Sequence, residues 1–317
     1  MKRNSLYSRL SIVLALAIAL AGCSKAPSAD TPSPDTKAET KSVPKDPVAS
    51  AASQKRVSSR PGNLGGTVFV AEYHNFKVGK GDFFRTKEQF QSDLERFYSM
   101  GFRPVLASEY LANKMPLPPG ASPVVITLDD SSPTQLQLMP DGSVDPNCAV
   151  GIWQEFAKTH LDFPVHGTFF VLPDTLWARK SNDDRKVKLI YSLGNELANH
   201  TMTHPILSHL TDDKVKWELG TANEKLEALG QPLPGPMALP FGVSPKHVSI
   251  LHGFDWNGKH VVFTGVFLNG AEPAKSPNNP KFNRFRVPRI IATTVPYGLD
   301  FWLDKLKAGK VKPYVQP

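Results

Sequence analysis

Between residues 66 and 242, apolar and polar positions follow two different patterns. Short apolar runs have the length and composition of buried strands, and the longer segments between them carry the periodicity of amphipathic helices. We expect strands at residues 66–74, 122–130, 166–173, 195–200 and 236–242. We expect helices at residues 86–101, 144–160, 183–194 and 211–230. In the first of these helices Thr86 is the predicted cap and Gly101 the predicted end.

This order of strands and helices predicts an α/β domain in which crossover helices connect parallel strands. Residues 63–317 suit one barrel-sized domain, because such barrels take about 250 residues. The pattern changes after Gly242. Segments 259–270 and 284–295 are predicted strands around a polar loop at 271–283, and residues 297–309 are predicted to form a last helix.

The first 22 residues differ from the rest of the chain. A basic stretch, "MKRNSLYSRL", precedes the apolar run "SIVLALAIAL" and the sequence "LAGC". The run is short for a transmembrane helix and is built like a secretory signal. "LAGC" resembles a bacterial lipobox, which implies that Cys23 is lipidated and becomes the mature N-terminus. We therefore expect residues 1–22 to be a lipoprotein signal peptide and the protein to be exported. Its lipid would anchor it to a membrane, facing the periplasm or the cell exterior. The alternatives are a plain signal peptide cut nearby and an uncleaved anchor.

Residues 23–62 are rich in Pro, Ser, Ala and Lys and hold no apolar side chain larger than valine. Such a segment cannot bury enough surface to offset the entropy of ordering it, so we expect a disordered tether. Once Cys23 carries lipid, Cys148 is the only cysteine left, and no intramolecular disulfide can form. Cys148 precedes an apolar helical pattern and is predicted to be a small buried residue.

The net charge of +8 lies mostly outside the predicted domain. The first 62 residues carry +6 of it, which leaves residues 63–317 with a net charge of +2. Because the predicted domain is nearly neutral, the basic pI is little evidence for nucleic-acid binding, and we expect no nucleic-acid partner.

Two acids and two histidines stand where a parallel barrel forms its active face, at the ends of predicted strands. Asp129 and Asp130 end segment 122–130, and His200 and His204 follow segment 195–200. Neighbouring residues of a strand point to opposite sides, so the two acids suit different tasks, one as a metal ligand and one as a base. One carboxylate and two imidazoles leave open positions on a zinc-like ion, as catalytic sites do. The alternatives are an Asp-Asp turn and a polar helix start with satisfied imidazoles.

The sequences "TLDDS" and "NHTMTHPILSHL" resemble the first two motifs of the polysaccharide deacetylase (NodB-homology) family, the family 4 carbohydrate esterases. The resemblance covers most of residues 65–245. It implies a distorted (β/α) barrel with one divalent metal, usually zinc, and removal of N- or O-acetyl groups from sugar polymers. It further implies that Asp130, His200 and His204 bind the metal and that Asp129 is the base that activates water.

The chain departs from the family pattern at two positions. Ser131 stands where the first motif usually ends in glycine, and Ala238 stands where the third motif usually has an arginine that pairs with the base. Without that partner the pKa of Asp129 should rise unless another cation, Arg286 or Arg289, replaces it. The following residues Pro240, Phe241 and Gly242 fit the third motif, which implies a substrate-binding role.

The general acid of the family is a late histidine, and no convincing late motif is present here. The sequence "VFVAEYHNF" resembles instead the N-terminal Tyr-His segment of permuted poly-N-acetylglucosamine deacetylases, which implies His74 as the acid. The alternative is a structural histidine at a strand end. Residues 255–258, "DWNG", are similar to the Asp-Trp motif of the family and equally to a hairpin turn.

We thus expect a monomeric, metal-dependent deacetylase acting on a cell-envelope or extracellular polysaccharide. Zinc is the expected metal, although an Asp-His-His site also accepts cobalt, nickel or manganese. One alternative is a catalytically weak carbohydrate-binding lipoprotein that lost turnover with the changes at Ser131 and Ala238. Another is a hydrolase of a different C–N amide bond. The sequence does not identify the polymer.

Overall fold

The computed structural model describes residues 57–178 and 184–317, all of which belong to one unit, residues 49–317. The predicted signal peptide, Cys23 and most of the predicted tether lie outside the described residues. In the part that is described, no helix is long and apolar enough to cross a membrane.

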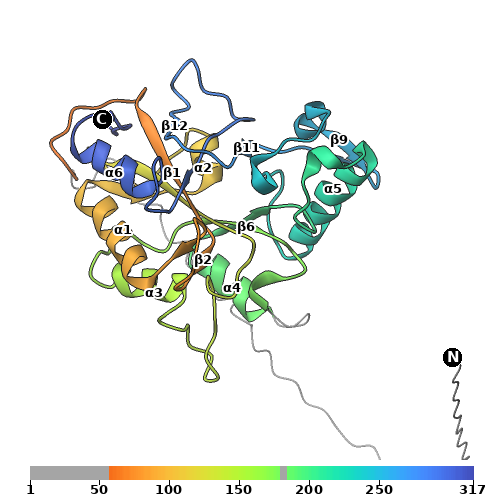
Figure 1. Cartoon of the computed structure of the whole chain (residues 1–317), viewed down its shortest axis with the longest axis horizontal. Helices are drawn as coiled ribbons and strands as arrows, with labels where there is room; N and C mark the ends of the chain where they lie inside the picture. The colour runs from red at the N-terminus through yellow and green to blue at the C-terminus, as the bar shows by residue number, and fades with distance from the viewer. Residues whose placement is uncertain (1–56, 179–183) are drawn as a thin grey trace, which may run out of the picture. The chain divides into compact units, whose positions relative to one another are not determined.

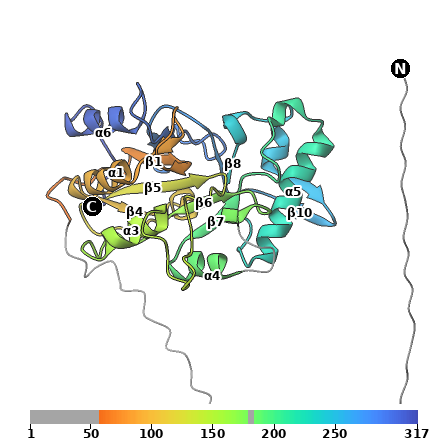
Figure 2. The ribbon, with the colours of Figure 1, turned by 60° about the horizontal axis from the view of Figure 1, so that its bottom comes forward.

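A nine-stranded, mostly parallel sheet forms the centre of the domain (Figure 2). Its main path runs β11–β8–β7–β6–β5–β1–β12, with β4 beside β5 and β13 beside β1. The strands are β1 (Thr67–Tyr73), β4 (Phe102–Pro104), β5 (Ser122–Asp129), β6 (Thr168–Val171), β7 (Glu196–Asn199), β8 (Met237–Ala238), β11 (Val266–Phe267), β12 (Ala274–Lys275) and β13 (Ile290–Ile291). Among the described strand pairs of this sheet, β1–β12 alone is antiparallel. The predicted α/β domain with a distorted barrel is confirmed.

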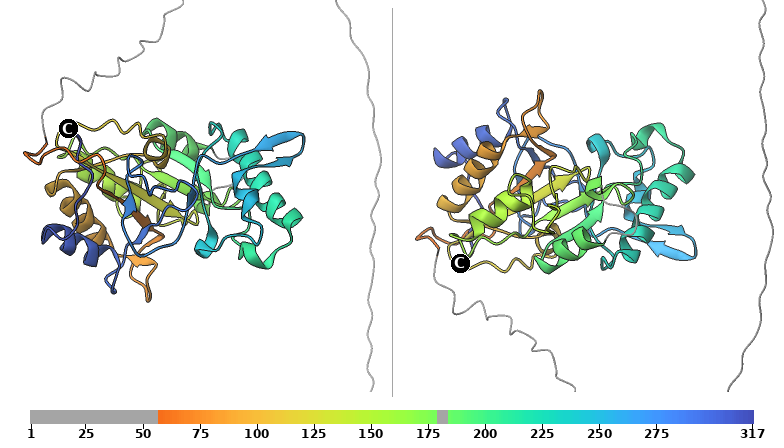
Figure 3. Two further views of the ribbon diagram at one scale, coloured as in Figure 1. Left: turned by 90° about the horizontal axis from the view of Figure 1, so that it is seen from above. Right: turned by 90° about the horizontal axis from the view of Figure 1, so that it is seen from below.

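The helices lie around this sheet in two groups. Helices α1, α3 and α6 lie together on one side, and α5 lies at the other end with a small hairpin of β9 and β10 (Figures 1 and 3). The bounds are α1 (Lys87–Ser99), α2 (Ala107–Leu111), α3 (Ala149–Ala157), α4 (Arg185–Ser192), α5 (Asp212–Ala228), α6 (Leu299–Lys307), β9 (Phe254–Trp256) and β10 (Lys259–Val261). As predicted, Thr86 caps α1, where its hydroxyl accepts a hydrogen bond from the Gln89 backbone at 3.3 Å.

Both faces of the sheet are buried, and strand alternation sorts the side chains between them. On β1, Phe69, Ala71 and Tyr73 face the core beneath α1 and α3. Val68 and Val70 face a second core, inside the barrel, that strands β5, β6, β7 and β8 also line. A polar side chain that keeps the same alternation beyond Val70 therefore points to the mouth of the barrel.

The strand predictions after residue 235 are correct in type but too long. Segment 236–242 is a strand only in β8, after which Pro240–Gly242 form a 3-10 turn. Segment 259–270 is broken into β10 and β11, and only Ile290–Ile291 of segment 284–295 form a strand. The predicted loop contains a strand, β12, because its backbone pairs with Thr67 and Val68 of β1. Sequence pattern alone cannot identify such a pairing partner.

The "DWNG" sequence at residues 255–258 forms the β9–β10 hairpin, with Asn257 and Gly258 both at positive φ (46° and 75°). This outcome confirms the hairpin alternative, and Asp255 and Trp256 do not line the cleft described below. Cys148 is buried and free, as predicted.

Candidate active site

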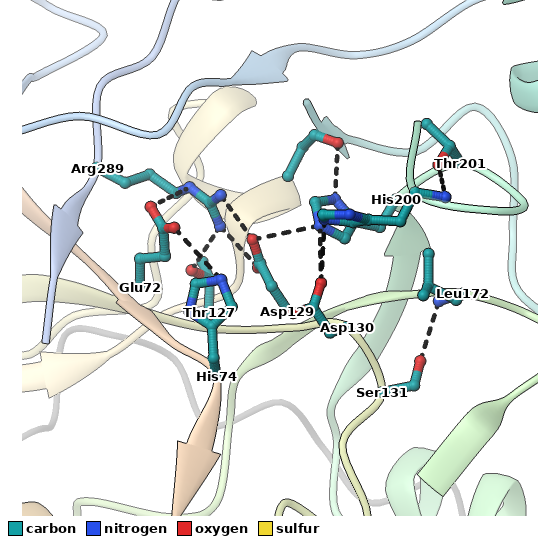
Figure 4. A network of polar contacts seen from close by, with 12 residues as sticks. Glu72, His74, Thr127, Asp129, Asp130, Ser131, Leu172, His200, Thr201 and Arg289 are labelled. Carbon is teal, nitrogen blue, oxygen red and sulfur yellow. Dashed lines mark hydrogen bonds and ion pairs between the residues drawn. The ribbon is translucent and has the colours of Figure 1, made fainter. Parts of the chain in front are cut away.

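The predicted site residues gather at the carboxyl ends of β1, β5 and β7, around a cleft of about 290 Å³ (Figure 4). On β5, Asp129 continues the inward alternation of Val125 and Thr127, and on β1 His74 continues that of Val70. Tyr73 pairs with Leu128 in the parallel register, so His74 and Asp129 follow side by side. The sheet thus brings together residues from three separate sequence segments.

Asp129 and Asp130 do not point to opposite sides, contrary to expectation. Asp129 is the last residue of β5, and Asp130 leaves the strand with φ of 71°. The turn brings both carboxylates to one imidazole: the Nε2 atom of His200 lies 3.7 Å from Asp129 Oδ2 and 3.4 Å from Asp130 Oδ1. The strict alternation of a strand applies only as long as the strand continues.

Ser131 also has a positive φ, 56°, a region that favours glycine. The serine hydroxyl accepts a hydrogen bond from the backbone of Leu172 at 2.9 Å, which a glycine could not do. Its backbone carbonyl accepts another from Trp177 at 2.9 Å. These two bonds anchor the turn after Asp130, so the departure at Ser131 keeps the local geometry.

Asp130, His200 and His204 offer three ligand atoms that converge on one point. Asp130 Oδ1 lies 3.4 Å from His200 Nε2 and 3.3 Å from His204 Nε2. Neighbouring ligands of a tetrahedral ion with bonds of about 2.1 Å lie about 3.4 Å apart. Asp130 Oδ1 is buried and has no hydrogen-bond partner among the residues that the structure describes, which is costly for a carboxylate unless a cation binds it. The three residues therefore fit a divalent metal.

Further contacts orient these ligands (Figure 4). His200 Nδ1 donates to the backbone carbonyl of Ala238 at 2.9 Å, so in the neutral ring Nε2, which faces Asp130, is free of a proton and available as a ligand. The backbone of His204, at φ of 58°, donates to the Thr201 hydroxyl at 3.0 Å. Glu218 of α5 accepts hydrogen bonds from the backbones of Met202 and Thr203, both at 2.9 Å.

Arg289 replaces the arginine that the sequence lacks at position 238. Its two terminal nitrogens donate to the two carboxylate oxygens of Asp129, both at 2.7 Å. Burial raises the pKa of Asp129, but the Arg289 guanidinium outweighs it and holds the pKa at about 2. Arg286, the other arginine considered, is exposed. Of the two arginines considered, Arg289 is thus the replacement, and the rise in the pKa of Asp129 that was expected without such a cation does not occur.

His74 and Glu72 complete this part of the site. His74 Nε2 lies 3.7 Å from Glu72 Oε1, and burial lowers the pKa of His74. Glu72 also lies 3.2 Å from Arg289. Burial raises the pKa of Glu72 to about 8, although Arg289 opposes the rise. Sequence reasoning missed Glu72; the available signal was an acid at an inward position of an otherwise apolar strand.

The Pro240–Gly242 turn forms one wall of the cleft. Phe241 is 56% exposed, has φ of 58°, and places its ring 4.7 Å from the His204 ring. Gly242 has φ of 68°, and a Cβ there would come 2.7 Å from the Asn269 backbone nitrogen. Pro240 is buried, so of these three residues Phe241 alone faces the cleft.

Residues 118–252 match the family model described as polysaccharide deacetylase. A chitooligosaccharide deacetylase of Bradyrhizobium sp. (strain ANU 289) is 35% identical over 85 residues, which are 26% of this chain and 37% of that protein. The match thus spans little more than a third of that relative.

Three solved structures share the fold. BC0361, a polysaccharide deacetylase from Bacillus cereus, has a TM-score of 0.56 and 16% identity over 76% of this chain and 69% of that one. The Streptococcus pyogenes deacetylase PplD, in complex with acetate, has a TM-score of 0.56 and 16% identity over 80% of this chain and 100% of its own. IcaB from Ammonifex degensii has a TM-score of 0.53 and 18% identity over 76% and 97% of the two chains.

At these identities the structural likeness concerns the fold. The sequence match contains Asp129, Asp130, His200 and His204, the residues around which the cleft is built. The described domain therefore has the distorted α/β barrel of the polysaccharide deacetylases, and its residues 118–252 match that family in sequence.

Proposed function

We propose that the chain is a metal-dependent hydrolase that removes N-acetyl or O-acetyl groups from a cell-envelope or extracellular polysaccharide. The observation that carries the proposal is the convergence of three ligand atoms beside a carboxylate held by Arg289. The match to a chitooligosaccharide deacetylase supports acetylated sugars as the substrate class. We propose that it acts as a monomer, since the proposed mechanism requires no residue from a second copy.

Asp130, His200 and His204 are the residues that would hold the metal. Zinc suits these donors, and cobalt, nickel or manganese can replace it. When bound, such an ion polarises the acyl carbonyl and lowers the pKa of a water beside it. His200 can serve as a ligand because its Nδ1 proton is held by the Ala238 carbonyl.

Asp129 is the proposed base, which takes a proton from the attacking water. With a pKa of about 2 it is ionised throughout the neutral range, because the Arg289 pair outweighs the effect of burial. A carboxylate of such low pKa is a weak base in water, so its contribution depends on its position. The two bonds from Arg289 fix that position.

His74 is the proposed acid. It donates a proton to the sugar nitrogen, or to the sugar oxygen of an ester, as the bond to the acyl carbon breaks. His74 lies beside Asp129 at the end of β1, so acid and base reach the same scissile group from neighbouring strands. The exposed Phe241 ring offers an apolar face for a pyranose ring, and Pro240 and Gly242 shape the turn that carries it.

Two observations favour turnover over the alternative of a binding protein. Arg289 supplies the charge that is missing at Ala238, and Ser131 keeps the turn after Asp130 with hydrogen bonds of its own. The two departures on which the weak-enzyme alternative rested are thus compensated within this chain.

The test measures bound metal and acetate release together. Purified protein is incubated with N-acetylglucosamine oligomers, peptidoglycan and acetylated xylan. The variants are His200→Ala, Asp129→Asn and, as a matched control, His209→Ala, an exposed histidine of the same loop. We expect acetate from at least one polymer, loss of both metal and activity in His200→Ala, and metal without activity in Asp129→Asn. An Asp129→Asn protein as fast as wild type would refute the base, and acetate release from none of the three polymers would refute the substrate class.

We further propose that a lipid on Cys23 anchors the protein to a membrane, outside the cytoplasm. The basic, apolar and "LAGC" segments in succession support this. Radiolabelled palmitate should be incorporated into the wild type and not into Cys23→Ala. Equal labelling of the two would contradict the anchor.

A further inference from the structure

Residues 263–317 carry a positive charge that the rest of the domain lacks. They contain nine Lys or Arg and three Asp or Glu, a net charge of +6. Because residues 63–317 together carry +2, the preceding residues 63–262 carry −4. A charge asymmetry of this size within one domain indicates that the basic part meets a negatively charged partner.

The acids of this segment do not neutralise its lysines. Asp300 pairs with Arg85 and Arg96, at 2.9 and 2.8 Å, and Asp304 pairs with Arg96 at 2.6 Å. Five lysines have neither an ion pair nor a side-chain hydrogen bond with any described residue, and all but the second are exposed: Lys275, Lys305, Lys307, Lys310 and Lys312. Their charge is therefore available to a partner.

Aromatic and aliphatic side chains lie among these lysines. Tyr297, just before α6, is 59% exposed, and its ring centroid lies 5.1 Å from that of Phe301. The Phe301 ring lies 5.2 Å from that of Trp302, and Lys305 Nζ lies 5.1 Å from the centre of the Phe301 ring. Val295 is exposed as well. These four apolar residues and the five lysines together form the α6 surface.

The α6 surface contains a hollow of about 440 Å³. Trp302 lines it together with Lys275, Lys310 and Lys312, and Glu272 is the one acid in this lining. Three lysines against one acid leave the hollow with a positive charge, which suits a phosphate-bearing head group.

The α6 surface lies on the outer side of the domain, next to α1 and away from α5 (Figure 3). None of its residues lines the cleft. The Lys312 carbonyl accepts a hydrogen bond from the backbone of Thr67, the first residue of β1, and Asn63 lines the hollow. Residues 1–62, with the predicted lipid site, are therefore joined to the domain beside these lysines.

We propose that the α6 surface rests on a membrane that contains anionic lipid, with its lysines at the phosphates and its aromatic rings at the level of the head groups. Lysine and exposed aromatic side chains together are typical of surfaces that lie in the membrane interface. An acidic polysaccharide would pair with the lysines but would leave Val295 and Tyr297 in water. The inference goes beyond the proposed hydrolase activity and does not rest on it.

The test measures which face of the domain touches the bilayer. The full chain is reconstituted into phosphatidylcholine vesicles with and without phosphatidylglycerol. A nitroxide is attached through Ala308→Cys at the exposed end of α6 or, as a matched control, through Ala228→Cys at the exposed end of α5. Collisions with oxygen, which concentrates in the bilayer, report contact. Chain without an added cysteine gives the background from Cys23 and Cys148.

We expect oxygen contact at the Ala308 label with phosphatidylglycerol, little contact without it, and none at the Ala228 label in either lipid. Each lysine near an anionic surface favours binding about fivefold, so a triple variant should lower the ratio of docked to free domains about 100-fold. This variant is Lys307→Gln/Lys310→Gln/Lys312→Gln. The matched control, which removes three exposed lysines elsewhere, should stay within about twofold of the wild type; it is Lys188→Gln/Lys214→Gln/Lys246→Gln.

Equal oxygen contact at the two label positions, or in the two lipid compositions, would overturn the proposal. So would a triple variant that docks like the wild type, or a chain that stays off both kinds of vesicle. Binding of polygalacturonate that the triple variant loses, without oxygen contact at the Ala308 label, would assign the surface to an acidic polymer instead. Acetate release enters none of these readouts, so they stand or fall separately from the proposed function.

Discussion

The Arg289–Asp129 pair should dominate both the stability and the activity of this site, and removing the cation tests that directly. In Arg289→Met the buried carboxylate of Asp129, 1% exposed, loses two charged hydrogen bonds of 2.7 Å. Such bonds contribute about 1.5–3 kcal/mol each, and breaking a buried ion pair costs about 3–5 kcal/mol. We therefore expect the free energy of unfolding at pH 7 to fall by about 4 kcal/mol.

The pH dependence of this loss has a definite sign. In the wild type the pKa of Asp129 is about 2, below its ordinary 3.8. Its ionised form therefore stabilises the fold above about pH 4, and this contribution to the free energy of unfolding is lost as the pH falls towards 2. Without Arg289, burial alone raises the pKa of Asp129, and its ionised form destabilises the fold near pH 7. The deficit of Arg289→Met relative to wild type should therefore shrink from pH 7 to pH 5.

Urea unfolding of metal-free protein, followed by tryptophan fluorescence, measures this deficit at both pH values. Arg286→Met, an exposed arginine of the same segment, is the control and should lose less than about 0.5 kcal/mol. If Arg289→Met does not fold at pH 7, the pH 5 measurement and the double variant Arg289→Met/Asp129→Asn remain. The double variant should recover stability at pH 7, because it leaves no ionised Asp129 buried without its partner. A deficit below about 1 kcal/mol at pH 7, or one that grows towards pH 5, would refute the reasoning.

Three further outcomes follow from the walls and ligands of the cleft. His200→Ala should bind less than about a tenth of an equivalent of zinc by elemental analysis, since two ligands hold an ion poorly; a full equivalent would contradict the ligand set. Phe241→Gly should raise KM for polymer severalfold while leaving the melting temperature unchanged or higher, because glycine relieves the positive φ of 58°; a lower KM would refute the contact with sugar. Gly242→Ala should cost about 1–3 kcal/mol of unfolding free energy, because its Cβ would lie 2.7 Å from Asn269 N; wild-type stability in urea would contradict this.

The sequence by itself determined the local parts of this protein. Apolar periodicity predicted the central strands β1, β5, β6 and β7 and the major helices, because periods of 2 and 3.6 residues are properties of single elements. The sequence also predicted that the two acids after a buried apolar run and the two histidines four residues apart lie close together. The reason is that the carboxyl ends of parallel strands meet at one edge of the sheet.

Only the tertiary structure decided which distant groups meet. Asp129 and Arg289 are 160 residues apart, and Arg289 reaches its partner because β13 pairs with β1, which pairs with β5. The positive φ of Asp130 likewise comes from a turn that Ser131 anchors to the backbone of Leu172. Short strands such as β12 have too few residues to show a period of two. Their pairing depends on which strand of the sheet lies beside them in the folded chain.

Glu72 lies between these two cases. Its inward position follows from the alternation of β1, which can be read from the sequence. Its contacts with His74 and Arg289 depend in addition on where β1 ends and on which strands lie beside it in the sheet. Periodicity can be read from consecutive residues, whereas the pairing of charged side chains depends on the order and register of the strands. These are set by packing over the whole chain, and for that reason the ligands were predictable and the network that orients them was not.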